Sequence, residues 1–170
     1  MNPLVRIAIA ASLCLLTASS GCGDGEVSIG GRLWIDAMPE GPRAPIAAFV
    51  VSRPGEGKGR YGSFYRGSLL RGGHDVFAWS EDSDDPSQVT LRLLQDGREV
   101  ALRVERCEPS PGFDHCVSLE GDPQGARRYQ SRRRWGAPES AGFEVRSVLS
   151  ALASEDAELA ALLANFADER

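Results

Sequence analysis

The clearest alternation of apolar and polar positions lies in residues 89–106. Two runs, VTLRLLQ and REVALRVER, flank Asp96-Gly97, a dipeptide favoured in two-residue type I′ turns because both central residues adopt positive φ. Such a turn pairs apolar residues across the two strands: Leu93 with Val100, Leu91 with Leu102 and Val89 with Val104. The pattern therefore predicts a β-hairpin with one buried face, since a slip of one residue would turn every apolar side chain outward.

Six further segments have the composition of β-strands, being rich in Val, Ile, Tyr, Phe or Trp and separated by clusters of Gly, Pro and Asp. They are 31–36, 45–52, 59–66, 75–80, 116–120 and 127–135. With the hairpin they make eight candidate strands. We therefore expect residues 31–136 to form a mainly β domain, an antiparallel sandwich or small barrel, rather than alternating βα units.

The chain changes character at its C-terminal end, 137–170, where Ala, Leu, Glu and Ser dominate. Apolar residues there recur at helical spacing: Val145, Val148, Leu149, Leu152, then Leu159, Leu162, Leu163 and Phe166. Ser154-Glu155-Asp156 has the composition of a helix cap followed by an acidic first turn, which predicts two short amphipathic helices, about 140–153 and 155–168. We expect these helices to pack on the β domain; docking of their apolar stripe onto a partner is the alternative.

The first 21 residues carry a different signal. Arg6 precedes a mostly apolar run of twelve residues, IAIAASLCLLTA, at 7–18. A helix needs about 20 apolar residues to cross a hydrocarbon core, whereas this length is typical of the apolar region of a secretory signal. We therefore expect 1–21 to be a signal peptide that is removed on export.

Small residues lead from this run into a cysteine, at Ala18-Ser19-Ser20-Gly21-Cys22, and here the chain resembles a bacterial lipoprotein precursor. In that family the signal is cut before the cysteine, whose sulfur receives a diacylglycerol and whose amine is then often acylated, with chains such as palmitate. Ser19 departs from the aliphatic residue usual three positions before the cysteine. The resemblance covers only the signal, and it implies a lipid attachment site at Cys22 followed by a short tether, 22–30.

An ordinary secretory signal, cut after a small residue such as Ser20, is the alternative to lipidation. Cys14 leaves with the signal in either case, so the exported chain keeps Cys22, Cys107 and Cys116. Lipidation of Cys22 leaves one natural pair, whereas plain secretion leaves an unpaired thiol in an oxidising compartment. The odd number of cysteines therefore favours lipidation.

The other two cysteines predict a structural disulfide. Cys107 continues the second hairpin strand on its outer face, and Cys116 begins a strand in which Val117 and Leu119 point inward. Both sulfur atoms therefore lie on the outer side and can meet. A redox or metal site is the alternative, but eight residues separate these cysteines and no second pair accompanies them.

Composition and charge exclude several classes of protein. With 170 residues, 42% of them hydrophobic and 25% charged, the chain is expected to form one globular domain rather than a disordered or fibrous protein. A net charge of −5 argues against a nucleic-acid binder that works by bulk charge. Asp24 and Glu26 lie beside the expected anchor, so no basic patch in the tether adds to membrane binding there.

Residues for catalysis are sparse. His74 and His115 are the only histidines, and Ser63 lies in a YGSFY segment that lacks the second glycine of a nucleophile elbow. The dipeptides His74-Asp75 and Asp114-His115 have no recognisable metal-ligand spacing, so we interpret them as solvated loop residues. The sequence therefore indicates no catalytic residue, no metal site and no cofactor.

Three clusters suggest binding chemistry, each with a plainer alternative. The acidic segment 81–85 has carboxylates for Ca²⁺ but lacks the glycine and glutamate of an EF-hand, which favours a solvated turn. Arginines at 127–128 and 132–134 suit an anionic lipid or glycan, or a charged edge strand partly neutralised by that acidic turn. The aromatic residues suit a sugar platform or, as we favour, core packing; they are Trp34, Tyr61, Phe64, Tyr65 and Trp79.

These observations together favour a non-enzymatic lipoprotein of the cell envelope, an accessory, assembly or binding subunit that meets another envelope protein. The rival hypotheses are a small hydrolase or glycan-active enzyme that uses the histidines, and a glycan- or Ca²⁺-binding module. In some bacteria an aspartate directly after the lipidated cysteine favours inner-membrane retention. Gly23 takes that place here, so the resemblance favours the outer membrane, facing the periplasm.

Overall fold

The computed structural model describes residues 29–52, 60–69, 71–138, 142 and 144–164. The expected signal peptide, Cys22 and most of the tether lie outside these residues.

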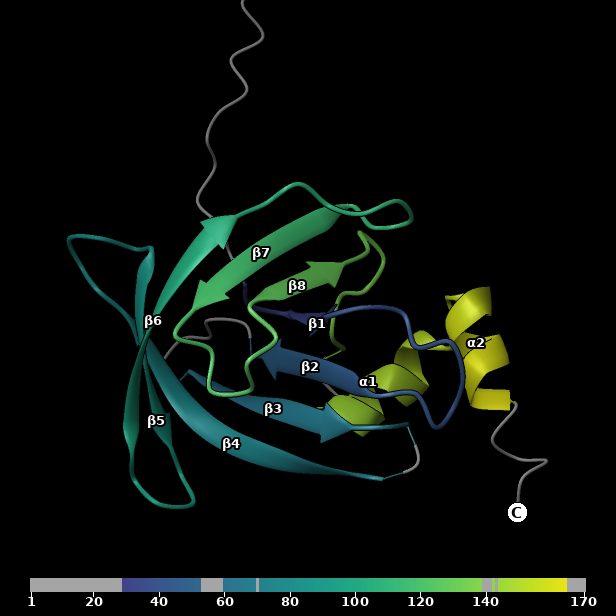
Figure 1. Ribbon diagram of the computed structural model, residues 1–170, viewed down its shortest axis with the longest axis horizontal. Helices are drawn as coiled ribbons and strands as arrows, with labels where there is room; N and C mark the ends of the chain where they lie inside the picture. The colour runs from purple at the N-terminus through teal and green to yellow at the C-terminus, as the bar shows by residue number, and fades with distance from the viewer. Residues whose placement is uncertain (1–28, 53–59, 70, 139–141, 143, 165–170) are drawn as a thin grey trace, which may run out of the picture.

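Eight antiparallel strands form a closed barrel in which each strand pairs with the next along the chain and the last pairs with the first (Figure 1). The strands are β1 (Arg32–Ile35), β2 (Ile46–Val51), β3 (Tyr61–Gly67), β4 (Gly72–Glu81), β5 (Gln88–Leu93), β6 (Glu99–Arg106), β7 (His115–Glu120) and β8 (Arg128–Ser131). Every candidate strand of the sequence corresponds to one of them. The mainly β fold is confirmed, and of the two expected architectures the protein has the barrel.

Aromatic and aliphatic side chains fill the interior of the barrel. The Phe49 ring lies 4.8 Å from the Tyr129 ring, edge to face, and the Phe64 and Phe77 rings also lie 4.8 Å apart, measured between centroids. Gly62 makes room for this packing, because an added Cβ would lie 2.6 Å from the Phe77 ring. The interior is therefore a packed core, as expected for a barrel of eight strands.

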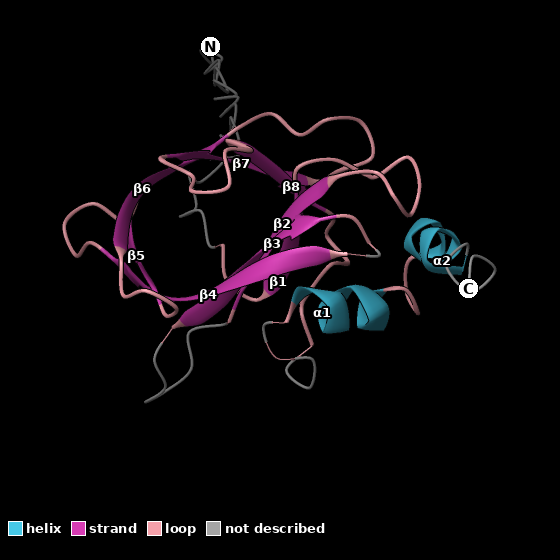
Figure 2. Ribbon diagram, turned by 60° about the horizontal axis from the view of Figure 1, so that its bottom comes forward, coloured by secondary structure: helices cyan, strands magenta, loops and turns pink. Residues whose placement is uncertain are grey.

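A second core lies outside the barrel wall, beneath two helices, α1 (Val145–Leu152) and α2 (Ala157–Ala164) (Figure 2). The helix α1 packs on β1, β2 and β3, and α2 packs against α1. β2 is consequently buried along its whole length, whereas in β5 burial alternates because its outer face meets solvent. The continuous apolar run IAAFVV thus marks a strand covered on both faces.

Both predicted C-terminal helices are present; α1 packs on the barrel as expected, and α2 packs against α1. The carboxylate of Glu144 caps α1 by accepting hydrogen bonds from the backbone N–H groups of Arg146 (3.1 Å) and Ser147 (2.7 Å). The helices are shorter than predicted, and parts of the predicted ranges, 140–141, 143 and 165–168, lie outside the described residues.

The predicted pairing within the hairpin was wrong by two residues. Leu91 pairs with Val100 and Val89 with Leu102, so the loop spans four residues, 94–97, instead of two. Gly97 has φ +71°, but Asp96 does not share the positive φ that a type I′ turn requires. The predicted buried face is nevertheless confirmed, since a shift of two residues leaves every side chain on its original side.

A disulfide joins Cys107 to Cys116, with their Cα atoms 5.0 Å apart, as the sequence predicts. Cys116 lies on the outer side of β7, opposite to the interior residues Val117 and Leu119. The Arg128 side chain donates to its sulfur atom from 3.2 Å, which leaves Cys116 only 5% exposed. The bridge closes the loop between β6 and β7.

Ile29, inside the expected tether, is the first residue that the structure describes. Ile29 is 5% exposed and belongs to the interior core, and its carbonyl accepts a hydrogen bond of 2.9 Å from the indole N–H of Trp34. Seven residues separate Ile29 from Cys22, a span of at most about 25 Å when fully extended.

Candidate functional site

The segment that follows β8, Arg132 to Trp135, forms the densest polar network among the described residues. Its central acceptor is Asp156, which is 1% exposed and lies just before α2. Arg132 donates from Nη1 to both Asp156 oxygens, at 2.9 and 3.2 Å, and the Trp135 indole donates to Oδ2 at 2.7 Å. Arg134 donates to Oδ2 at 3.1 Å. One buried carboxylate thus accepts hydrogen bonds from three side chains of a single loop.

The same carboxylate begins α2. Its Oδ1 accepts the backbone N–H groups of Glu158 (3.1 Å) and Leu159 (3.2 Å), which is the geometry of an N-cap. The predicted cap lay two residues too early: Ser154 was expected to cap the helix with Glu155 and Asp156 in its first turn, whereas Asp156 is the capping residue and α2 begins at Ala157. Because Asp156 also binds Arg132, it fastens the helix pair to the end of β8.

The electrostatics explain why this buried charge is tolerated. Burial alone would raise the pKa of Asp156, but hydrogen bonds from Trp135, the Leu159 backbone and Arg132 lower that pKa to about 2. Burial would likewise lower the pKa of Arg132, and its bonds to Glu158 and Asp156 raise it instead. The Arg132 guanidinium also lies over the Trp135 and Phe113 rings, 5.2 and 5.6 Å from their centroids.

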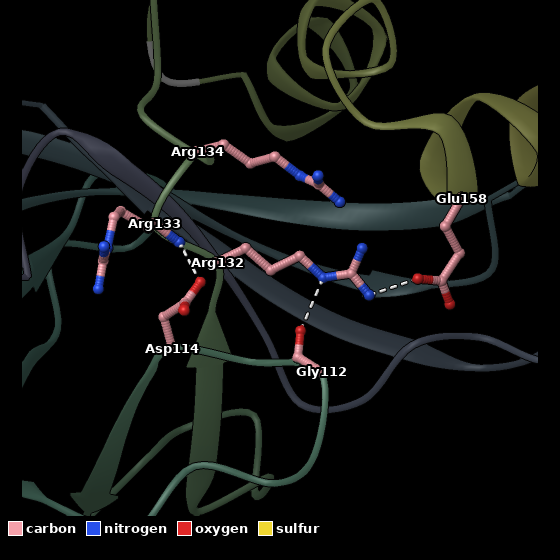
Figure 3. Close-up of a pocket in the computed structure, with 6 residues that line it drawn as sticks. All are labelled: Gly112, Asp114, Arg132, Arg133, Arg134 and Glu158. Atoms are coloured by element: carbon pink, nitrogen blue, oxygen red, sulfur yellow. Dashed lines mark hydrogen bonds and ion pairs between the residues drawn. The ribbon is translucent and has the colours of Figure 1, made fainter.

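A shallow hollow of about 430 Å³ opens beside this network (Figure 3). It is lined by Gly112, Asp114, Arg132, Arg133, Arg134 and Glu158. Arg132 and Arg134 point toward α2, whereas Arg133 points to the opposite side (Figure 3). The lining holds three guanidinium groups and two carboxylates, and Arg132 and Arg134 are already paired with carboxylates of the protein.

The interpretation of the arginines as a charged edge strand was wrong. The barrel is closed by pairing of β8 with both β7 and β1, so β8 has no free edge. The acidic turn 81–85 does not neutralise them either. Arg132 binds Asp156 and Glu158, and Arg134 binds Asp156.

The structure keeps the two histidines apart. His74 lies on β4 opposite Tyr65 of β3, and His115 lies on β7 opposite Ser131 of β8, so β5 and β6 lie between the two histidines in the barrel. The interpretation of both histidines as loop residues was therefore wrong. Ser63 is buried on β3. Among the described residues, no group of three or more His, Cys, Asp or Glu side chains is placed to hold a metal ion.

The acidic segment 81–85 forms the end of β4 and the turn toward β5. Glu81 makes an ion pair with Arg60, whose guanidinium lies 4.9 Å from the centroid of the Trp79 ring. Asp82 accepts the backbone N–H groups of Asp84 and Asp85, at 2.8 and 3.1 Å. The carboxylates of Glu81 and Asp82 are thus used within the protein itself.

The aromatic residues proposed as a core are confirmed with one exception. Trp34, Phe64, Tyr65 and Trp79 are all at least 94% buried. Tyr61 is 39% exposed at the start of β3. No stacking platform is therefore formed by these five side chains together.

Sequence reasoning missed the pairing of Arg132 with Asp156, although both residues were singled out. Two features of the sequence together could have indicated this pairing. One is an aspartate just before a leucine-rich helix, and the other is a run of arginines that ends in a tryptophan. Trp135 is fully buried, so the arginines before it lie close to the core, where a buried positive charge needs a negatively charged partner.

Comparison of the chain with protein-family models, with curated proteins and with solved structures finds no match. Across the described residues, every helix is too short or too polar to span a bilayer.

Proposed function

We propose that this protein is a lipid-anchored protein of the bacterial cell envelope, held by acyl chains on Cys22, whose barrel is a non-enzymatic accessory or binding subunit. The observation that carries the proposal is the signal-like segment that ends at Cys22. Removal of residues 1–21 would make this cysteine the first residue of the exported chain.

The disulfide supports lipidation of Cys22. Cys107 and Cys116 are bonded to each other, and Cys14 lies within the expected signal. Cys22 therefore has no cysteine partner left in the exported chain. A thioether to diacylglycerol removes the free thiol that an oxidising compartment would otherwise modify.

Such an anchor is effectively permanent and places the barrel close to the membrane. Each buried CH₂ group contributes about 0.8 kcal/mol, so two or three long chains on one residue hold far more firmly than a single myristoyl group. The tether to Ile29 spans at most about 25 Å. The barrel then meets only partners at the membrane surface, and Gly23 after Cys22 favours the outer membrane.

A binding role fits the packing of the barrel. Its interior is filled by side chains, so contacts with a ligand or partner come from the outer surface and the loops. The described hollow offers charged groups suited to recognition, and we propose another envelope protein as the partner.

Cell fractionation of a Cys22→Ser variant tests the proposal. We expect the wild type to sediment with membranes after a high-salt wash and to be released only by detergent, whereas the variant becomes soluble. Salt matters because it removes proteins held by charge alone. Cys14→Ser is the matched control, since that thiol leaves with the signal, and it should behave as wild type. A Cys22→Ser protein that resists the salt wash as the wild type does contradicts the proposal.

A further inference from the structure

The disulfide between Cys107 and Cys116 joins two sulfur atoms with different surroundings. Cys116 is only 5% exposed on β7, and the Arg128 guanidinium donates from Nε to its sulfur atom at 3.2 Å. Cys107 lies directly after β6 and is partly exposed. An incoming nucleophile therefore reaches the sulfur atom of Cys107 more easily than that of Cys116.

The Arg128 side chain also fixes which sulfur atom leaves more readily when the bridge opens. Its Nη2 donates to the carbonyl of Glu108, in the loop that the bridge closes, so two contacts hold the guanidinium beside the disulfide. A nearby positive charge stabilises a thiolate over the neutral thiol. Because the leaving sulfur atom carries the negative charge in thiol–disulfide exchange, Cys116 is the better leaving group.

Hydrogen bonds keep the two cysteines together without the bridge. The Cys107 N–H donates to the Cys116 carbonyl at 3.2 Å, and the strand pairing between β6 and β7 continues beside them. The loop between the cysteines is fastened to the end of β8, because the Asp114 N–H donates to the Ser131 carbonyl at 3.0 Å. None of these bonds involves a sulfur atom, so the thiols of an open bridge stay adjacent and can join again without refolding.

We propose that the Cys107–Cys116 bridge is a reversible redox site that a dithiol of another molecule reduces, with Cys107 as the attacked residue and Cys116 as the leaving group beside Arg128. A thiolate of the dithiol bonds to the Cys107 sulfur atom, and the electron pair of the broken S–S bond leaves on Cys116. The second thiolate of the dithiol then attacks its partner sulfur in the mixed disulfide and releases Cys107. The bridge gains two electrons, the dithiol becomes a disulfide, and its two protons pass to the protein thiols or to solvent.

Equilibration of the full chain with reduced and oxidised dithiothreitol tests the role of Arg128. The chain carries Cys14→Ser and Cys22→Ser, so that only the bridge reacts. We expect Arg128→Gln to lower the equilibrium constant for reduction by about 5-fold at pH 8.5, because the Cys116 thiolate loses its positive partner. At pH 6 the two constants should agree within about 2-fold, because both reduced proteins then hold neutral thiols. Comparison with the parent at each pH cancels the titration of the dithiol itself.

Two further variants separate the charge of Arg128 from a merely structural role. Arg128→Lys keeps the positive charge and should stay within about 2-fold of the parent at both pH values. Arg103→Gln is the matched control, because Arg103 is exposed on β6 and pairs with Glu105 at 2.8 Å, and it should not change the equilibrium. A contact that only supports the loop predicts an Arg128→Gln bridge that is easier to reduce at both pH values. That result overturns the proposal, as does an unchanged constant at pH 8.5.

Trapping with reduced glutathione identifies the attacked sulfur atom. Free thiols are alkylated after a short reaction, and cleavage after Phe113 separates the two cysteines for mass spectrometry. We expect glutathione on Cys107 and the alkyl group on Cys116 in at least about 5-fold excess over the reverse pattern. Equal labelling, or glutathione mainly on Cys116, overturns the assignment.

Circular dichroism of the reduced chain tests reversibility. The reduced protein should keep the spectrum of the oxidised protein and recover the bridge when oxidised dithiothreitol is added. A chain that unfolds on reduction would show that the bridge only holds the fold together, which overturns the proposal. Because Cys22 is absent from these experiments and the bridge is intact in the fractionation above, the two proposals fail independently.

Discussion

Asp156 illustrates how a single residue can join two parts of this fold. Its side chain is buried, caps α2 and accepts hydrogen bonds from Arg132, Arg134 and Trp135. A helix start near this position was predictable because it depends on neighbouring residues, although the predicted cap lay two residues earlier. The contact between Asp156 and Arg132, 24 positions earlier, was not predictable, because it depends on how α1 packs on the barrel and therefore on where α2 begins.

Replacement of Asp156 by Asn should lower the free energy of unfolding by about 3 kcal/mol at pH 7, because it leaves the buried Arg132 charge without its buried partner. The folded-state pKa of about 2 lies below the ordinary 3.8. The carboxylate therefore stabilises the fold fully above about pH 4, and this stabilisation is lost as the pH falls toward 2. The difference between wild type and variant should shrink over that range.

Urea unfolding at pH 7 and at pH 2.5 measures this difference. Glu158→Gln is the control, because Glu158 also binds Arg132 but its side chain is 56% exposed, so its loss should cost about 1 kcal/mol or less. An Asp156→Asn variant with the same stability deficit at both pH values would show that the carboxylate's charge is not what holds the helices.

At the scale of elements, the hairpin of β5 and β6 shows what a hydrophobic pattern determines and what it leaves open. Alternation fixed the buried face correctly. It could not fix the pairing, because registers two residues apart bury the same side chains. The turn decided between them: the Leu93 N–H donates to the Arg98 carbonyl at 2.9 Å and the Gly97 N–H donates to the Leu93 carbonyl at 2.9 Å, which closes a loop of four residues, 94–97.

Gly97→Ala should lower the free energy of unfolding by about 1 kcal/mol, because an L-residue other than Gly, Asn or Asp is strained in the left-handed region. Gly97 has φ +71° with open space around it, so the cost comes from backbone strain and not from a steric clash. Gly41→Ala is the control, since Gly41 also has open space and lacks a positive φ. Thermal unfolding of both variants checks the prediction, and equal melting temperatures would contradict it.

At the scale of the whole molecule, the number of strands and the helical C-terminal segment followed from the sequence, because both depend on local pattern. Closure of the sheet into a barrel did not follow from local pattern. It requires β8 to pair with β1, almost 100 residues away, at Ile35 and Gln130. The incorrect edge-strand interpretation of the arginines had the same origin, since only closure shows that β8 has two neighbours.

Mass spectrometry of the protein purified from membranes tests the anchor most directly. We predict that the mature chain begins at Cys22 and that its N-terminal peptide carries the added mass of a diacylglyceryl group on sulfur. A chain that begins elsewhere, or an N-terminal peptide with an unmodified Cys22 thiol, would contradict the account.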